Sequence, residues 1–148
     1  SFDRYLYAVD AADGSLRWKF MAENWFWAKP VIYNGTIYAG CLDGKVYVLD
    51  AETGGQAANA IDLGSPKDGN SVSSSPVLAG NSIIVATESG KVYSIDTGNN
   101  QKRLLVNLEE KVYAPLAASQ GNVYIHTASD ALYAVDAQSG AIREFNIK

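Results

Sequence analysis

The chain has 148 residues, of which 47% are hydrophobic and 19% charged, a composition typical of a folded domain and not of a disordered segment. Its net charge of −4, without a basic cluster, argues against nucleic-acid binding, which needs Lys and Arg to neutralise phosphates. No apolar run reaches the roughly 20 residues that span a bilayer. The single cysteine excludes an internal disulfide and a thiolate metal cluster.

A repeat of about 40 residues runs along the whole chain. Tyrosines recur at steps of 40, 46 and 40 residues, and an aspartate follows each tyrosine three residues later. These positions are Tyr7, Tyr47, Tyr93 and Tyr133, followed by Asp10, Asp50, Asp96 and Asp136. Turn-forming pairs such as Asn34-Gly35 and Asp43-Gly44 separate short runs rich in Val, Ile and Tyr. This pattern predicts four short strands in each repeat.

In chain order, the repeats divide the sequence into a half-blade (1–20) and three blades (21–63, 64–108 and 109–148). In the second repeat the expected strands are about Pro30–Tyr33, Thr36–Cys41, Lys45–Asp50 and Ala57–Leu63, and Ala141–Ile147 is the expected last strand. Apolar residues at successive positions indicate sheets covered on both faces. We therefore expect an all-β fold, a partial β-propeller of about three and a half four-stranded antiparallel blades. Two other folds fit the sequence less well. Helical repeats would need long glycine-poor stretches, and a β-sandwich does not predict identical residues at steps of about 40 positions.

A motif that follows the aspartates resembles the tryptophan motif of the PQQ-like (quinoprotein-type and BamB-like) β-propeller repeats. In the first repeat Asp10 is followed by Gly14 and Trp18, and Gly54 and Gly140 hold the place of Gly14 in two later repeats. The tryptophan position is kept only at Trp18. We interpret these residues as structural: the aspartate accepts hydrogen bonds from the turn that it opens, and the glycine supplies special backbone angles. The tryptophan is expected to cover the seam to the next blade.

The stretch from Glu23 to Lys29 departs most from the repeat. In a propeller, loops that enter inner strands gather at one mouth of the central channel, so Trp25, Trp27, Lys29 and Tyr113 are candidates for an aromatic ligand surface there. The alternative is that the tryptophans pack between blades. An insertion at Gly64–Val72 is expected to form a mobile loop at the same mouth.

Two chemically reactive residues have plainer interpretations. His126, the only histidine, shares its repeat position with Gly40 and Ala86, so we expect it to pack where blades approach closely. Cys41 corresponds to Thr87 and Thr127, which also suggests packing. The sequence presents no catalytic constellation and no metal site, and we predict neither.

The resemblance implies a non-catalytic binding or scaffold segment of a larger bacterial protein, extracytoplasmic (periplasmic, cell-surface or secreted). The alternative is a fragment of a PQQ-dependent quinoprotein dehydrogenase whose catalytic residues lie outside this chain. PQQ enters only through the resemblance, because the residues here do not support a PQQ or calcium site. Three and a half blades fall short of a ring, so the expected partners are the remaining blades of the same propeller or another chain. A protein or small-molecule ligand is expected at the channel mouth.

Overall fold

The computed structural model describes residues 2–145, and within them nearly all the regular secondary structure is β-strand. The first sheet pairs β1 (Tyr5–Val9) with β2 (Leu16–Met21). The second sheet contains β3 (Val31–Tyr33), β4 (Thr36–Gly40), β5 (Lys45–Asp50) and β6 (Gln56–Asp62). The third contains β7 (Val77–Ala79), β8 (Ser82–Ala86), β9 (Lys91–Asp96) and β10 (Lys102–Asn107). The fourth contains β11 (Ala117–Ser119), β12 (Asn122–His126), β13 (Leu132–Asp136) and β14 (Ile142–Phe145).

Each sheet is an antiparallel meander in which strand order follows chain order. The central hairpins keep one register, because the repeated aspartate at the end of the third strand always pairs with the first residue of the second strand. These pairs are Thr36 with Asp50, Ser82 with Asp96, and Asn122 with Asp136. The β3–β4 turn uses Asn34 and Gly35 at φ +47° and +73°, the left-handed angles that a tight hairpin requires.

The predicted all-β partial propeller is confirmed, with small shifts at strand ends. β4 ends at Gly40, before Cys41, and β6 begins at Gln56. The last predicted strand, Ala141–Ile147, is seen as β14, and its end at Asn146–Ile147 lies outside the described residues, as does Ser1.

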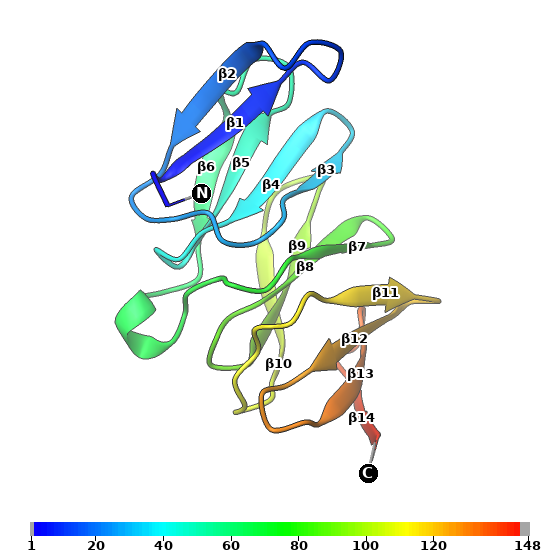
Figure 1. The fold of residues 1–148 in the computed structure, drawn as a ribbon. Coiled ribbons are helices and arrows are strands. Elements are labelled where there is room, and N and C mark those ends of the chain that lie inside the picture. Colours follow the sequence, from blue (N-terminus) through cyan, green and yellow to red (C-terminus); the bar gives the residue numbers. More distant parts are fainter. Residues whose placement is uncertain (1, 146–148) are drawn as a thin grey trace.

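The sheets stand one behind the next, and the first strands of neighbouring sheets, β3, β7 and β11, lie beside one another (Figure 1). The meander places the loops between sheets (22–30, 63–76 and 108–116) on the same rim as the β4–β5, β8–β9 and β12–β13 turns. We call this the loop rim. The turns that contain the repeated aspartates lie on the opposite rim, at the other ends of the strands.

Three apolar seams join consecutive sheets. In the first seam, Leu6, Trp18 and Phe20 of the first sheet pack against the second sheet, where Tyr47 and Leu49 are buried. The second seam joins the second and third sheets. Its core residues are Tyr38, Val46, Val48 and Ile61 from one side and Ile83, Val85 and Ile95 from the other. Because each inner sheet contributes to two seams, both of its faces are apolar, as successive apolar residues predicted.

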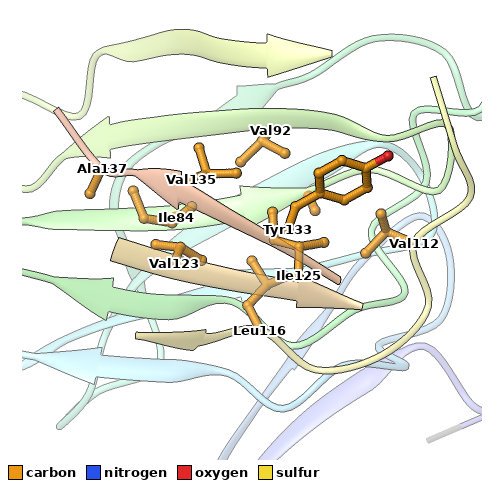
Figure 2. Close-up of a cluster of buried hydrophobic side chains, with 10 residues drawn as sticks. Ile84, Val92, Val112, Leu116, Val123, Ile125, Tyr133, Val135 and Ala137 are labelled. Carbon is orange, nitrogen blue, oxygen red and sulfur yellow. The ribbon is translucent and has the colours of Figure 1, made fainter. Parts of the chain in front are cut away.

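The third seam joins the third and fourth sheets, and Figure 2 shows its core. Ile84 and Val92 meet Val123, Ile125 and Val135, all five fully buried. Burial of this kind contributes roughly 25 cal/mol for each Å² of apolar surface removed from water. Neighbouring sheets therefore stabilise one another, and a single sheet would leave its apolar faces in water.

Candidate functional site on the loop rim

Backbone hydrogen bonds fix which residues of the three loops correspond. In each four-stranded sheet, the turn between the second and third strands donates one N–H to a carbonyl of the loop that enters that sheet. The bonds are Leu42 N to Trp25 O (3.1 Å), Glu88 N to Ser71 O (2.9 Å) and Ala128 N to Lys111 O (2.8 Å). Trp25, Ser71 and Lys111 therefore occupy one repeat position, and Trp27, Ser73 and Tyr113 occupy another two residues later.

Between these two positions, each of the three loops between sheets has one apolar residue whose side chain is buried. Phe26, Val72 and Val112 are buried, with 5%, 0% and 0% of their surfaces exposed. Phe26 packs its ring against Tyr47, with centroids 5.7 Å apart. Gly40 shows how close this packing is, because a Cβ built there would lie 2.4 Å from Cγ1 of Val72. We call Phe26, Val72 and Val112 the plug residues.

The tryptophans beside the first plug residue point toward solvent. Trp25 is 39% exposed and Trp27 is 59% exposed. Phe2, from the segment before β1, meets both indoles nearly edge-on, with ring centroids 5.1 Å and 5.6 Å apart. The alternative, in which one or both tryptophans pack between blades, does not agree with this exposure. Phe26 is the residue of this loop that packs in the first seam. Phe2, Trp25 and Trp27 form the exposed aromatic group on this rim.

The other two predicted site residues lie elsewhere on the loop rim. The backbone N–H of Lys29 donates to Oγ of Ser75 at 3.0 Å, which ties loop 22–30 to loop 63–76. Tyr113 occupies the repeat position of Trp27 and is 47% exposed. It lines a separate pocket of about 250 Å³ with His126 and Asp130. Among the ring contacts of residues 2–145, none joins Tyr113 to either tryptophan.

His126 differs from its expected role, because its side chain is 47% exposed and is not packed between sheets. Its Nε2 lies 3.5 Å from Oδ1 of Asp130. Cys41 is fully buried, and its thiol donates to the carbonyl of Trp25 at 3.4 Å. Burial raises the pKa of this thiol to about 12, so it stays protonated and unreactive at neutral pH.

The repeated aspartates are occupied by the turns that they open. Oδ1 of Asp50 accepts the N–H groups of Glu52 and Thr53 and the hydroxyl of Thr53. Asp136 does the same for Gln138 and Ser139. The backbone N–H bonds lower the pKa of both carboxyls, which are ionised at neutral pH. Asp10 and Asp96 also accept N–H groups of their turns.

Trp18 crosses the first seam at one of these turns. Its Nε1 donates to the carbonyl of Ala51 at 3.1 Å, and its ring lies on Gly54, where a Cβ would come within 2.4 Å of the indole. Trp18 therefore lies over the turn of the following sheet.

Three of the four repeated tyrosines donate their hydroxyl to a carboxylate. Tyr47 OH donates to Asp43 at 2.7 Å, and Tyr133 OH donates to Glu110 at 2.8 Å. Tyr7 OH donates to Asp3 at 2.5 Å. Tyr93 instead stacks under the ammonium group of Lys102, 5.7 Å from the ring centroid.

Sequence reasoning missed the carboxylate of Glu110. It accepts hydrogen bonds from the hydroxyls of Thr127 (2.6 Å), Ser129 and Tyr133. The hydrogen bond from Ser129, followed by those from Thr127 and Tyr133, lowers the pKa of Glu110. The hydrogen bond between Tyr133 and Glu110 also raises the pKa of Tyr133 to about 12. The group fastens loop 108–116 to the β12–β13 turn.

The insertion between the second and third sheets is organised by its own side chains. It contains the short 3-10 helix η1 (Pro66–Asp68), in which the N–H of Lys67 donates to the side chain of Ser65. Asn70, only 3% exposed, donates to the carbonyl of Ser65 and accepts from Lys91 at 3.3 Å. Later in the same loop, the buried Oγ of Ser73 has no hydrogen-bond partner among the described residues.

Neither a metal site nor a membrane helix stands out in the described part of the chain. Within residues 2–145, no three or more His, Cys, Asp or Glu side chains gather in a way that would hold a metal ion. No helix in the same range is long and apolar enough to cross a membrane.

The amino-acid sequence matches a known family. The family model described as outer membrane protein assembly factor BamB matches residues 2–60 and 28–144. The chain belongs to this BamB family of PQQ-like repeats. BamB from Moraxella catarrhalis superposes with a TM-score of 0.76 at 18% identity, over 97% of this chain and 43% of that protein. The computationally designed protein Ika8 gives 0.82 at 18% identity, over 98% and 44%.

Two further comparisons involve enzymes. Quinohemoprotein alcohol dehydrogenase from Comamonas testosteroni gives a TM-score of 0.78 at 12% identity, over 96% of this chain and 32% of that enzyme. At these identities the structural matches show the fold alone. The β-alanine-activating enzyme of Danio rerio is 35% identical over 103 residues, 65% of this chain. The chain spans only 8% of that relative and less than half of the matched structures.

Proposed function

We propose that this chain is a non-catalytic binding segment of a larger propeller and that the loop rim around Phe2, Trp25 and Trp27 is its contact surface. The exposure of both tryptophans carries the proposal. At the same repeat positions the next sheet has Ser71 and Ser73, so neither the fold nor the plug requires indoles there. Exposed Trp side chains that supply large apolar area are typical of the residues that dominate protein–protein binding.

Most groups that would support catalysis are engaged in the fold. The repeated aspartates accept turn N–H groups, Cys41 is buried with a raised pKa, and Glu110 accepts three hydroxyls. His126 is accessible, and its neighbour Asp130 is 3.5 Å away on an exposed turn. A rigid stack of sheets with one variable rim suits a scaffold whose specificity lies in its loops.

The family supports a location outside the cytoplasm, as a periplasmic, cell-surface or secreted segment, because the matching model is that of an outer membrane assembly factor. The remaining blades would come from the same polypeptide or another chain. The match to 8% of a β-alanine-activating enzyme also supports a role as one module of a long protein.

A photo-crosslinker tests the contact surface. Benzoylphenylalanine in place of Trp27 is expected to give one product of defined mass with a partner in the native extract. The same group in place of Glu52, on the opposite rim, is the matched control and should give none. Equal products from both positions, or none from either, would contradict the proposal.

A second candidate is a segment of a quinoprotein dehydrogenase, which the likeness to quinohemoprotein alcohol dehydrogenases favours. The residues of this chain do not fit PQQ with calcium: the only cysteine is buried and the repeated carboxylates are already hydrogen-bonded to turns. Titration with PQQ and Ca²⁺, followed by quinone absorbance, separates the candidates. A saturable spectral change would favour the dehydrogenase segment, and an unchanged spectrum would favour the binding segment.

A further inference from the structure

The third sheet differs from the others in what the hydroxyl of its repeated tyrosine meets. In the other three sheets this hydroxyl donates to a carboxylate. The pairs are Tyr7 with Asp3, Tyr47 with Asp43 and Tyr133 with Glu110. Tyr93 of the third sheet is only partly buried, and no carboxylate of the described residues accepts its hydroxyl. Because seams cover both faces of the third sheet, its neighbours on either side are described.

The fourth sheet shows how this fold binds a carboxylate beside the repeated tyrosine. Oε2 of Glu110 accepts the hydroxyls of Thr127, at 2.6 Å, and Ser129. Its Oε1 accepts the hydroxyl of Tyr133 at 2.8 Å. The two turn hydroxyls lie 3.1 Å apart, and Oγ1 of Thr127 also accepts the N–H of Ala131 at 3.3 Å. The backbone of the β12–β13 turn therefore holds this pair of hydroxyls.

The β8–β9 turn of the third sheet holds an equivalent pair of hydroxyls in the same way. Oγ of Ser89 lies 3.2 Å from Oγ1 of Thr87. Oγ1 of Thr87 accepts the N–H of Lys91, also at 3.2 Å. Each distance is 0.1 Å from its counterpart in the fourth sheet. The turn alone thus arranges the pair, with or without a carboxylate, and a preorganised pair of donors lowers the cost of binding.

The loop beside this pair supplies an amide in place of the carboxylate. Asn70 occupies the repeat position of Glu110, because the next residue in each loop accepts the equivalent N–H of the turn. The side chain of Asn70 is buried and engaged. It donates to the carbonyl of Ser65 at 3.1 Å and accepts from Nζ of Lys91 at 3.3 Å. The amide is neutral, so it leaves the charge of the Lys91 ammonium group unbalanced.

The ammonium group of Lys91 therefore differs from its counterpart in the second sheet. Lys45 pairs with a carboxylate, that of Glu23, at 2.7 Å. Among the described residues, no carboxylate oxygen lies within 4 Å of Nζ of Lys91. A second ammonium group, that of Lys102, lies 5.7 Å from the ring centroid of Tyr93. The two lysines place positive charge beside the hydroxyl that lacks a carboxylate.

A groove of about 380 Å³ lies next to this group, between residues 58–62 and 99–102. Lys102 forms part of its wall, so a dissolved molecule can approach the lysine that covers Tyr93. The carboxylate of Asp62, in the opposite wall, accepts the N–H of Gly64 at 2.8 Å. The backbone therefore engages the acidic side chain of this groove.

We propose that the third sheet binds the carboxylate group of a small organic acid at the position where the fourth sheet binds the carboxylate of Glu110. The donors are the hydroxyls of Thr87, Ser89 and Tyr93 and the ammonium group of Lys91. Hydrogen bonds to an ionised acceptor are stronger than those to a neutral one. Lys91 adds a charge that the fourth sheet lacks, since Ala131 holds the equivalent position there. The site is independent of the aromatic group on the loop rim.

Titration of the isotope-labelled chain with sodium acetate, followed by NMR, tests the site, because acetate has the same charged group as the Glu110 side chain. The amide signals of Ser89 and Lys91 are expected to shift saturably with acetate and not with sodium chloride of equal ionic strength. Lys91→Met should weaken acetate binding by about tenfold or more, because a charge-assisted hydrogen bond is lost. Lys45→Met alters the equivalent lysine, which already pairs with Glu23, and should leave acetate binding unchanged.

Two further variants test the donors and the loop. Asn70→Asp supplies a carboxylate from the loop itself and should abolish the response to acetate. Tyr93→Phe removes only a hydroxyl and should weaken acetate binding several-fold, so it tests the site even if the aspartate variant fails to fold.

The proposal is wrong if acetate and chloride give the same shifts, or if Lys91→Met binds acetate as tightly as the wild type. Tighter binding of inorganic phosphate than of acetate would overturn the assignment to a carboxylate. Loss of crosslinking at Trp27 would leave the titration unchanged, so this proposal and the proposed function fail separately.

Discussion

The first and third seams use one framework and complete it with different side chains. Loops 22–30 and 108–116 have the same length and insert Phe26 and Val112 at the same place. Beside the plug residue, however, one loop has two exposed tryptophans and the other has Lys111 and Tyr113. The comparison separates positions fixed by packing from positions free to serve binding.

The polar contacts of the two seams also differ. In the first seam one exposed ion pair, Glu23 with Lys45, joins loop to turn at 2.7 Å. In the third, the single carboxylate of Glu110 collects hydroxyls from the next turn and strand. Both seams thus have a polar tie between loop and turn, but the two ties differ in chemistry. Measurements on matched residues of the two seams test this distinction.

Replacing the plug residue Phe26 should destabilise the chain far more than replacing its neighbour Trp27. Phe26→Ala should lower the free energy of unfolding by about 3–5 kcal/mol, because it leaves a cavity in the first seam. Trp27→Ala, one residue away, should change it by less than about 0.5 kcal/mol, because that indole is mostly in solvent. Urea midpoints measure both. If the two variants were equally destabilised, the division into packing and binding positions would be wrong.

The repeat positions could be predicted from sequence because their chemistry is local. An aspartate that caps its own turn needs only residues two or three positions away, so Asp50 and Asp136 behave as expected whichever sheet lies beside them. The direction of Trp25 and Trp27 could not be predicted in this way. Side chains alternate in direction along an extended segment, so the residue between the two tryptophans points the opposite way. Alternation does not show which of the two directions leads to the interior, and the hydrogen bond from Leu42 N to Trp25 O decides this.

Residues that depend on a neighbouring loop were harder to predict. His126 was expected to pack because Gly40 does, yet Gly40 is covered by Val72 of the following loop, and no such loop covers His126 in the described residues. Glu110 was missed because its partners lie 17–23 residues later in the chain. The recurring pair Thr87 and Ser89, equivalent to Thr127 and Ser129, was the available signal.

The next effect compares how the two seams cover a turn glycine. Gly54 and Gly140 have the same left-handed backbone, at φ +72° and +75°, so alanine is strained alike in both. A Cβ at Gly54 meets an indole that can shift, whereas one at Gly140 meets the backbone carbonyl of Leu105. Gly140→Ala should therefore be the more destabilising, by about 1 kcal/mol or more.

Thermal or urea unfolding of the two glycine variants measures the difference, and Gly14→Ala reports the backbone strain alone because nothing lies within 4 Å of it. Equal losses of stability for Gly54→Ala and Gly140→Ala would mean that the backbone at Leu105 shifts as easily as the ring of Trp18.

A smaller, pH-dependent effect belongs to Glu110. Its pKa is lowered in the folded chain, so its ionised form stabilises the fold above the ordinary value of 4.5, and this contribution is lost as pH falls through the lowered pKa. Glu110→Gln should reduce stability at pH 7, and its difference from wild type should shrink toward pH 3. Glu109→Gln in the same loop is the control. A difference in stability that does not depend on pH would mean that the hydroxyl groups bind the neutral and the ionised side chain of Glu110 equally well.

The smallest effect is expected at the polar tie of the first seam. Glu23 is 73% exposed and Lys45 29% exposed, so solvent screens their attraction, and Glu23→Gln should lower stability by only a few tenths of a kcal/mol. In 1 M NaCl, where charges are screened within about 3 Å, the loss should fall further, while that of Phe26→Ala persists. Glu52→Gln, on the opposite rim, controls for the change in net charge. A loss at Glu23 as large as that at Glu110 would mean that the two ties contribute equally to stability. A loss at Glu23 that salt does not reduce would mean that this contact does not act through the attraction of exposed charges.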